Sequence, residues 1–200
     1  MSTAAKVLVL FAHPALEKSR VNRRLAEAAA KVEGVKFHDL YEEYPDLQIP
    51  HRREQAMLRT HDTIVFQHPF YWYSSPAILK EWMDHVLTRG FAYGTGGDAL
   101  ANKTLVSVIT TGGPKESYLR GSQNHVTLRE LLAPFEQTAR LCGMRYLRPY
   151  AIQGTASLTE PEIAEHARNY AVFLGGLRDG RINHQKVADY PCLGHGAENF

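Results

Sequence analysis

The 200-residue chain has the length of a single domain, and its composition, 44% hydrophobic and 22% charged, is that of an ordinary globular protein. A net charge of +2 with dispersed lysines and arginines excludes a nucleic-acid-binding surface built on a basic cluster. Only Cys142 and Cys192 are present, so we expect no disulfide framework and a cytoplasmic location. No apolar run reaches the roughly 18 residues that cross a bilayer, so any association with the inner membrane is expected to be peripheral.

The first half of the chain predicts three strands separated by helices. Residues 6–12 form a short apolar run, which is typical of a strand buried on both faces of a parallel sheet. Apolar residues then recur at helical spacing, with Ser19 as the expected N-cap and Gly34 closing the helix. The elements expected next are a strand over 35–40, an aromatic and acidic loop over 41–50, a short helix over 52–59 and a strand over 63–67.

The second half continues this alternation. Ser75 is expected to cap a helix with Pro76 at its first position. Pro134 is expected to kink the long helical stretch that ends at Leu141, or to begin its main part. The other elements expected are a Gly-rich segment over 89–103, strands over 104–109 and 146–152, and a last helix over 161–177, opened by a capping box of Thr159 and Glu162.

This order of elements predicts an α/β protein with a parallel sheet. Five strands favour the three-layer flavodoxin-like fold, strand order 2-1-3-4-5, over the six-stranded dinucleotide fold. We expect one domain over residues 1–180 and a tail over 181–200 that lacks periodicity. Ligands of open α/β sheets lie beyond the carboxyl ends of the strands, so the loops after the first, third and fourth strands are the expected site.

The loop after the first strand runs from His13 to Asn22 and lacks the glycine fingerprint of dinucleotide-binding folds. Free amides at the start of the following helix can bind a phosphate, and the side chains of Ser19 and Asn22 add donors. Taken alone, this loop is explained more simply by Ser19 as a helix cap and His13 as a loop residue.

The loop after the third strand holds four consecutive aromatic residues, Phe70, Tyr71, Trp72 and Tyr73. Four such side chains are costly to leave in water, and they suit a wall against which a flat ring lies. A local aromatic cluster packed on the following helix is an equally open interpretation. Trp82, on the apolar stripe of that helix, is assigned to the core.

The fourth strand is followed by Thr110, Thr111, Gly112 and Gly113. Glycines let a backbone approach a ligand closely, and threonines donate hydrogen bonds. Tyr118 and His125, a little further on, are candidates to supply a proton or stabilise charge when a ring system is reduced. A plain glycine turn with exposed polar residues is the alternative, and it is the joint placement of three such loops that favours a ligand site.

The sequence resembles the NAD(P)H:quinone reductase family in three motifs. They are AHP followed by S-x-x-N, the segment HPFYWYSSPAILKEWMDHVLTRGFAYG, and TTGG. Within that family the likeness is strongest to the small bacterial ancillary proteins of glutathione-regulated potassium efflux, the KefF/KefG type. It extends from about Lys6 to the last helix; the long middle motif is highly specific, whereas TTGG alone would be weak.

The resemblance implies a flavin site. It places the phosphate and ribityl chain against His13, Ser19, Arg20, Val21 and Asn22. It places the ring edge on residues 70–73 and 110–113.

The resemblance also implies catalytic residues and a homodimer. Tyr118 matches a tyrosine that assists charge transfer at the flavin, and His125 lies near a corresponding histidine although the loop lengths differ. Phe91 and Tyr93 resemble aromatic residues that close the pocket of the opposite subunit, which implies a homodimer with shared sites.

The function implied is ping-pong hydride transfer from NADH or NADPH to a quinone, with FMN preferred to FAD because the resemblance is to short members. One alternative is a regulatory subunit that binds and activates a membrane potassium–proton antiporter. A flavodoxin-type electron carrier is disfavoured by the slightly basic charge. A hydrolase or metal enzyme is disfavoured because the sequence has no metal-binding or nucleophile motif, and no metal ligands are assigned.

Overall fold

The computed structural model describes residues 4–182, 184–188 and 190–194. Its sheet consists of β1 (Val7–Phe11), β2 (Val35–Asp39), β3 (Thr63–Pro69), β4 (Thr104–Thr110), β5 (Arg145–Tyr146) and β6 (Tyr150–Ile152). The strand order is β2-β1-β3-β4-β5, β6 also pairs with β4, and every pairing is parallel. The predicted α/β class and the order 2-1-3-4-5 are therefore confirmed.

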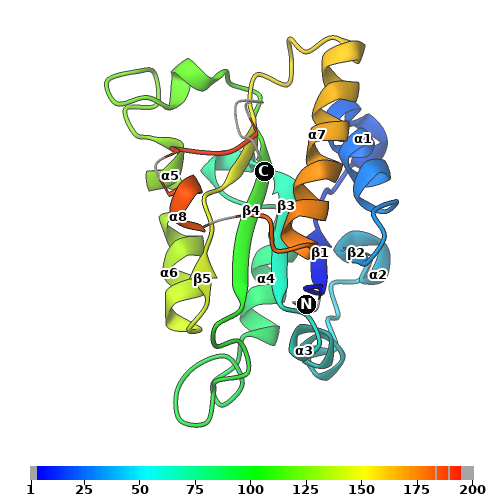
Figure 1. Cartoon of the computed structure of the whole chain (residues 1–200), viewed down its shortest axis with the longest axis vertical. Helices are drawn as coiled ribbons and strands as arrows, with labels where there is room; N and C mark the ends of the chain where they lie inside the picture. Colours follow the sequence, from blue (N-terminus) through cyan, green and yellow to red (C-terminus); the bar gives the residue numbers. More distant parts are fainter. Residues whose placement is uncertain (1–3, 183, 189, 195–200) are drawn as a thin grey trace.

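Helices cover both faces of this sheet (Figure 1). On one face α1 (Arg20–Ala29) packs against α7 (Glu160–Arg178). The other face carries α2 (Leu40–Glu43), α3 (His51–Arg59), α4 (Ala77–Val86), α5 (Leu128–Leu131) and α6 (Ala133–Leu141). The short helices are η1 (Leu16–Lys18), η2 (Tyr71–Tyr73), η3 (Lys115–Tyr118) and α8 (His184–Val187). The sheet is thus the middle of three layers, with one apolar core on each side.

Two helix starts follow the sequence signals. The Ser19 hydroxyl accepts a hydrogen bond from the amide of Asn22 at 3.1 Å, so Ser19 caps α1 as predicted. At α7 the Glu162 carboxylate accepts hydrogen bonds from the amide and hydroxyl of Thr159, at 2.8 and 2.6 Å, which closes the predicted capping box. Both helices begin on the carboxyl side of a strand, where a ligand site is expected.

Three expected boundaries were wrong. The second strand ends at Asp39 because its carboxylate accepts the amides of Tyr41 and Glu42. Helix α2 therefore begins at Leu40, the last residue of the expected strand, and continues into the expected loop. The N-cap of α4 is Pro76 rather than Ser75. The last expected strand is two short ones, β5 and β6, because Pro149 has no N–H to pair with the sheet.

The described part of the C-terminal segment packs against the sheet. The Leu193 amide donates to the carbonyl of Pro149 at 2.8 Å, and the Leu193 carbonyl accepts the amide of Ala151 at 2.9 Å. Cys142 and Cys192 are both buried, and no disulfide joins them. The division of the chain at residue 180 stays a prediction.

Candidate functional site

A cleft of about 510 Å³ lies at the carboxyl ends of the strands. The loop after β1, the start of α1, the ends of β3 and β4 and the loop after β6 all contribute to it. Its lining residues are His13, Ala15, Lys18, Ser19, Arg20, Val21, Asn22, Pro69, Phe70, Tyr71, Thr110, Gly112, Thr155 and Ala156. The structure therefore brings together all five residues expected at the phosphate and ribityl end with four of the eight expected at the ring.

One end of the cleft is the start of α1. The amides of Arg20 and Val21 lie in the first turn and have no acceptor within the helix, so they and the helix dipole favour an anion there. The Arg20 guanidinium donates to the Glu160 carboxylate at 2.8 Å and to the carbonyl of Leu158 at 3.1 Å. This exposed ion pair ties the start of α1 to the start of α7.

The Asn22 side chain lies at the base of the cleft with only 4% of its surface exposed. Its Nδ2 donates to the Thr110 hydroxyl at 2.9 Å, and this assigns Oδ1 as the remaining acceptor. That oxygen is buried and has no hydrogen-bond partner among the residues that the structure describes. A buried acceptor without a partner is costly, so the position fits a ligand that brings a hydroxyl donor, as a ribityl chain does.

The turn after β4 presents bare backbone to the cleft. A Cβ added at Gly112 would meet nothing within 4 Å, so the glycine leaves room against which a ligand can lie. Thr111 differs from expectation: its hydroxyl donates to the carbonyl of Gly113 at 2.7 Å, so it braces the turn. Gly113 does not line the cleft. A Cβ at this position would lie 3.5 Å from the Tyr118 ring.

The four aromatic residues divide into different environments. Phe70 is buried and packs near Tyr118 with ring centroids 6.4 Å apart, as in a local aromatic cluster. Tyr71 lines the cleft, and its ring meets that of His13 edge-on at 6.0 Å. Trp72 is 93% exposed and Tyr73 half-exposed, both outside the cleft lining. Of the four aromatic residues expected to form a wall for a flat ring, Phe70 and Tyr71 line the cleft.

Tyr118 lies beside the cleft, and His125 lies apart from it. Burial raises the pKa of the Tyr118 hydroxyl, and the nearby Thr111 opposes part of that rise. Tyr118 is therefore protonated at neutral pH and able to donate a proton. It lines a second hollow of about 360 Å³ that reaches the segment 190–192. His125 is exposed on a turn with φ of 61° and lines neither space.

Phe91 and Tyr93 belong to the segment 88–103, which leads into the start of β4 and lies at the opposite end of the sheet from the cleft (Figure 1, green loop at the bottom). Phe91 is buried in its own chain, with the Arg59 guanidinium 5.0 Å from the centre of its ring. Tyr93 is half-buried. Neither residue lines the cleft of its own chain.

Sequence reasoning missed the loop after β6. Thr155 and Ala156 line the cleft, and the amide and hydroxyl of Thr155 both donate to the carbonyl of Thr111, at 3.0 and 3.1 Å. The rule that ligands lie beyond strand ends would have pointed to this loop had it been applied to the last strand. Within the described residues there is no group of three or more metal-ligating side chains, and no helix long and apolar enough to span a membrane.

A parallel sheet of this order, with a helix start and an aromatic wall at its carboxyl edge, defines a protein of the flavodoxin-like class. The chain belongs to the family described as flavodoxin-like fold, whose family model matches residues 5–174.

Known proteins support the predicted resemblance. The KefG ancillary protein of the glutathione-regulated potassium-efflux system of Escherichia coli is 49% identical over 174 residues, 87% of this chain and 95% of the relative. General stress protein 14 of Treponema denticola, solved with FMN, is 34% identical with a TM-score of 0.82, over 86% of this chain and 99% of that chain. An NADPH-quinone reductase from P. pentosaceus is 32% identical with a TM-score of 0.76, over 84% of this chain and 96% of that chain.

Proposed function

We propose that this chain is an FMN-dependent NAD(P)H:quinone oxidoreductase. The observation that carries the proposal is the buried Asn22 Oδ1, which has no partner in the described part of the chain and lies in one cleft with the start of α1 and the Tyr71 ring. A phosphate, a hydroxylated chain and a flat ring are the three parts of FMN, and the cleft offers a complement to each. The FMN complex of general stress protein 14 supports the choice of cofactor.

The residues have separate roles in this proposal. The amides of Arg20 and Val21 hold the phosphate, with Ser19 and His13 beside it. Asn22 and Thr110 orient the ribityl chain, and Tyr71 with the Gly112 backbone holds the ring. Trp72, Tyr73, Thr111 and Gly113 act at the periphery of the ring site, where the aromatic residues extend the wall and the turn residues shape the backbone.

A bound flavin supplies the redox chemistry, taking a hydride from NADH or NADPH and passing two electrons to a quinone in ping-pong order. The chain contributes placement and protons. Tyr118, protonated and beside the ring end of the cleft, donates a proton or hydrogen bond as the acceptor is reduced. His125 is the second proposed proton donor, although it is exposed on a turn outside the cleft.

The proposed assembly is a homodimer in which the partner's Tyr93 closes the cleft. Tyr71, Trp72 and Tyr73 are exposed at the cleft edge, and a partner subunit would remove this aromatic surface from water. Phe91 is buried within its own chain, so the proposal assigns the closing contact to Tyr93.

The test is anaerobic reduction of the purified protein. NADPH or NADH should bleach the flavin absorbance, and a quinone added afterwards should restore it. A flavin that stays oxidised in excess of both nucleotides would reject the enzymatic proposal.

A second candidate function is regulation of a potassium-efflux antiporter, which the 49% identity to KefG favours. Such a subunit would sit at the cytoplasmic face of the inner membrane through its partner. Capture of the antiporter from membranes by the tagged chain would support this role. Capture that is unchanged when flavin is stripped would make the two functions independent.

A further inference from the structure

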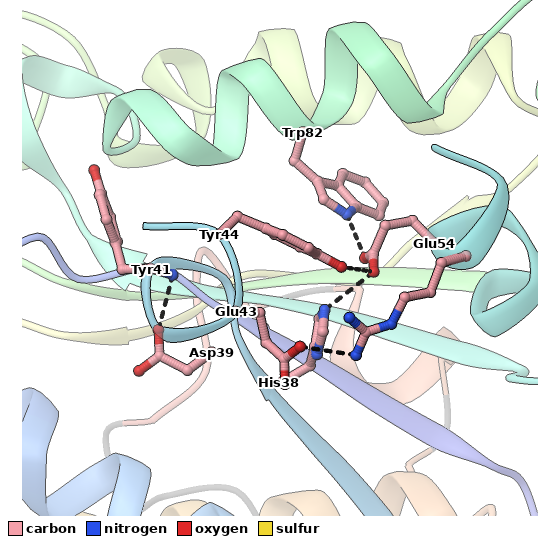
Figure 2. Close-up of polar contacts among 8 residues, drawn as sticks. His38, Asp39, Tyr41, Glu43, Tyr44, Glu54 and Trp82 are labelled. Carbon is pink, nitrogen blue, oxygen red and sulfur yellow. Dashed lines mark hydrogen bonds and ion pairs between the residues drawn. The ribbon is translucent and has the colours of Figure 1, made fainter. Parts of the chain in front are cut away.

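The least expected group outside the cleft is the carboxylate of Glu54 on α3, of which 1% is exposed. Its Oε1 accepts hydrogen bonds from the Tyr44 hydroxyl at 2.5 Å and from His38 Nε2 at 3.2 Å, and its Oε2 accepts one from Trp82 Nε1 at 2.7 Å. Figure 2 shows the three donors converging on it. Burial alone would raise the pKa of Glu54, but the three hydrogen bonds outweigh it and lower that pKa, so the group is an anion at neutral pH.

The three donors come from separate parts of the fold. His38 lies on the edge strand β2, Tyr44 directly follows α2, and Trp82 lies on α4. The donors are 10 to 28 residues from Glu54 in sequence. One carboxylate therefore connects the edge strand β2 with α2, α3 and α4, which cover the same face of the sheet. Removing it would leave three buried donors unpaired.

Two of these elements lie next to the segment 70–76, whose first residues line the cleft. Helix α4 begins at Ala77, directly after the aromatic segment 70–76. On α2, burial raises the pKa of the Tyr41 hydroxyl. A hydrogen bond with the Ile78 backbone opposes that rise, and the nearby Tyr71 adds to it. The Tyr41 hydroxyl thus lies against the start of α4 and beside a residue that lines the cleft.

The aromatic segment is strained and needs support at both ends. Trp72 and Tyr73 have φ of 50° and 62°, a left-handed backbone that bulky residues adopt only at an energetic cost. At its start the segment is held by the Phe70 amide, which donates to the carbonyl of Thr110 at 2.8 Å. At its end it continues into α4, which the Trp82–Glu54 hydrogen bond anchors.

We propose that Glu54 is a positioning residue for the flavin ring: by holding Trp82 and Tyr44 it fixes α4 and α2, and so keeps the strained aromatic segment in the shape that faces the ring. This inference rests on the proposed function, since it requires the cleft to bind a flavin. Glu54 has no part in binding the phosphate, because α1 lies on the other face of the sheet.

The test is Glu54→Gln, which keeps the shape of the side chain but replaces one acceptor oxygen with a donor. Binding of FMN and of riboflavin is measured by quenching of flavin fluorescence, together with the visible circular dichroism of the saturated complex. Both ligands should bind about tenfold more weakly, because both lose the ring site. The preference for FMN over riboflavin should persist, since the phosphate site is untouched, and the dichroism of bound FMN should weaken.

Two further variants separate positioning from general stability. Leu100→Ala makes a cavity in the same core, in the segment before β4, and should lower the melting temperature without changing the dichroism of bound FMN. Trp82→Phe removes one donor and keeps an aromatic ring, so it should weaken flavin binding about threefold even if Glu54→Gln fails to fold.

Wild-type flavin affinity and wild-type dichroism in Glu54→Gln would overturn the positioning role and leave the proposed function standing. If only Trp82→Phe folds, the same result in that variant would do so. Wild-type protein that binds neither flavin would instead reject the proposed function, and this inference with it.

Discussion

The Asn22 side chain on α1 and the Thr110 hydroxyl at the end of β4 are joined by a hydrogen bond of 2.9 Å. The two residues are 88 positions apart in sequence, and both line the cleft. The bond therefore fixes the distance between the anion-binding helix start and the backbone turn that faces the ring. Because Nδ2 donates to Thr110, the other side-chain atom of Asn22 is the acceptor Oδ1, which has no partner among the described residues. A ligand with hydroxyl groups would supply the missing donor.

Asn22→Ala should weaken FMN binding about tenfold, because it removes both the bond to Thr110 and the free acceptor. Titration of flavin fluorescence measures the effect. Ser107→Ala is the matched control, since it breaks the buried hydrogen bond to the Tyr146 hydroxyl, at 2.8 Å, outside the cleft. An equal loss of FMN affinity in both variants would assign the effect to stability instead of to the cleft.

Tyr118→Phe should slow quinone reduction about a hundredfold and leave the dissociation constant of FMN nearly unchanged, because the variant loses a proton donor and keeps the ring. Stopped-flow reoxidation of the reduced protein measures the step. Tyr146→Phe, which removes a buried hydroxyl far from the cleft, should leave the rate unchanged. A Tyr118→Phe variant that loses FMN but turns over normally when saturated would remove Tyr118 from the catalytic residues.

A mixture of two inactive variants tests the shared site. If the partner's Tyr93 closes the cleft, Tyr93→Ala and Tyr118→Phe subunits form hybrid dimers with one intact site and one doubly altered site. Equal mixing after subunit exchange should then restore about a quarter of wild-type activity. Activity equal to the mean of the two unmixed variants would show that Tyr93 acts within its own subunit or not at all.

The buried His68 should make the fold sensitive to acid. Burial lowers the pKa of His68 to about 4 from 6.5, and its Nδ1 faces the carbonyl of Pro69 at 2.9 Å. The unfolded chain takes up this proton near its ordinary pKa while the folded chain resists it. Stability is therefore complete above about pH 6.5 and falls as the pH drops toward 4, by about 3 kcal/mol in all.

Urea unfolding at about pH 7.5 and about pH 4.5 measures this loss in the wild type and in His68→Gln. Burial also lowers the pKa values of His13 and His166. Both histidines are present in the wild type and in the variant, so the difference in pH dependence between the two proteins is due to His68. Identical pH dependence in the two proteins would contradict the assignment.

The sequence predicted those parts of the fold that depend on local pattern. Ser19 and the Thr159–Glu162 pair begin helices because their capping groups lie within three residues of the amides they satisfy. The break at Pro149 and the cap at Asp39 were missed, although both residues carry the signal: proline cannot donate to a sheet, and aspartate competes for nearby amides.

Glu54 illustrates what pattern cannot reach. A glutamate on a polar helix is ordinarily exposed, and its burial becomes evident only when residues from four elements are brought together. Trp82 was correctly assigned to the core, but its hydrogen bond to that carboxylate could not be read from spacing. At the cleft the sequence identified three of the contributing loops and missed the one after β6. The split between Tyr71 in the cleft and Trp72 in solvent depends on backbone angles.

The claim that this cleft holds FMN is tested most directly by the small molecule that purified protein releases on denaturation, separated by chromatography and identified by absorbance and mass. The account predicts FMN, in an amount approaching one per chain. Protein that is colourless, releases no flavin and takes up no added FMN would contradict it.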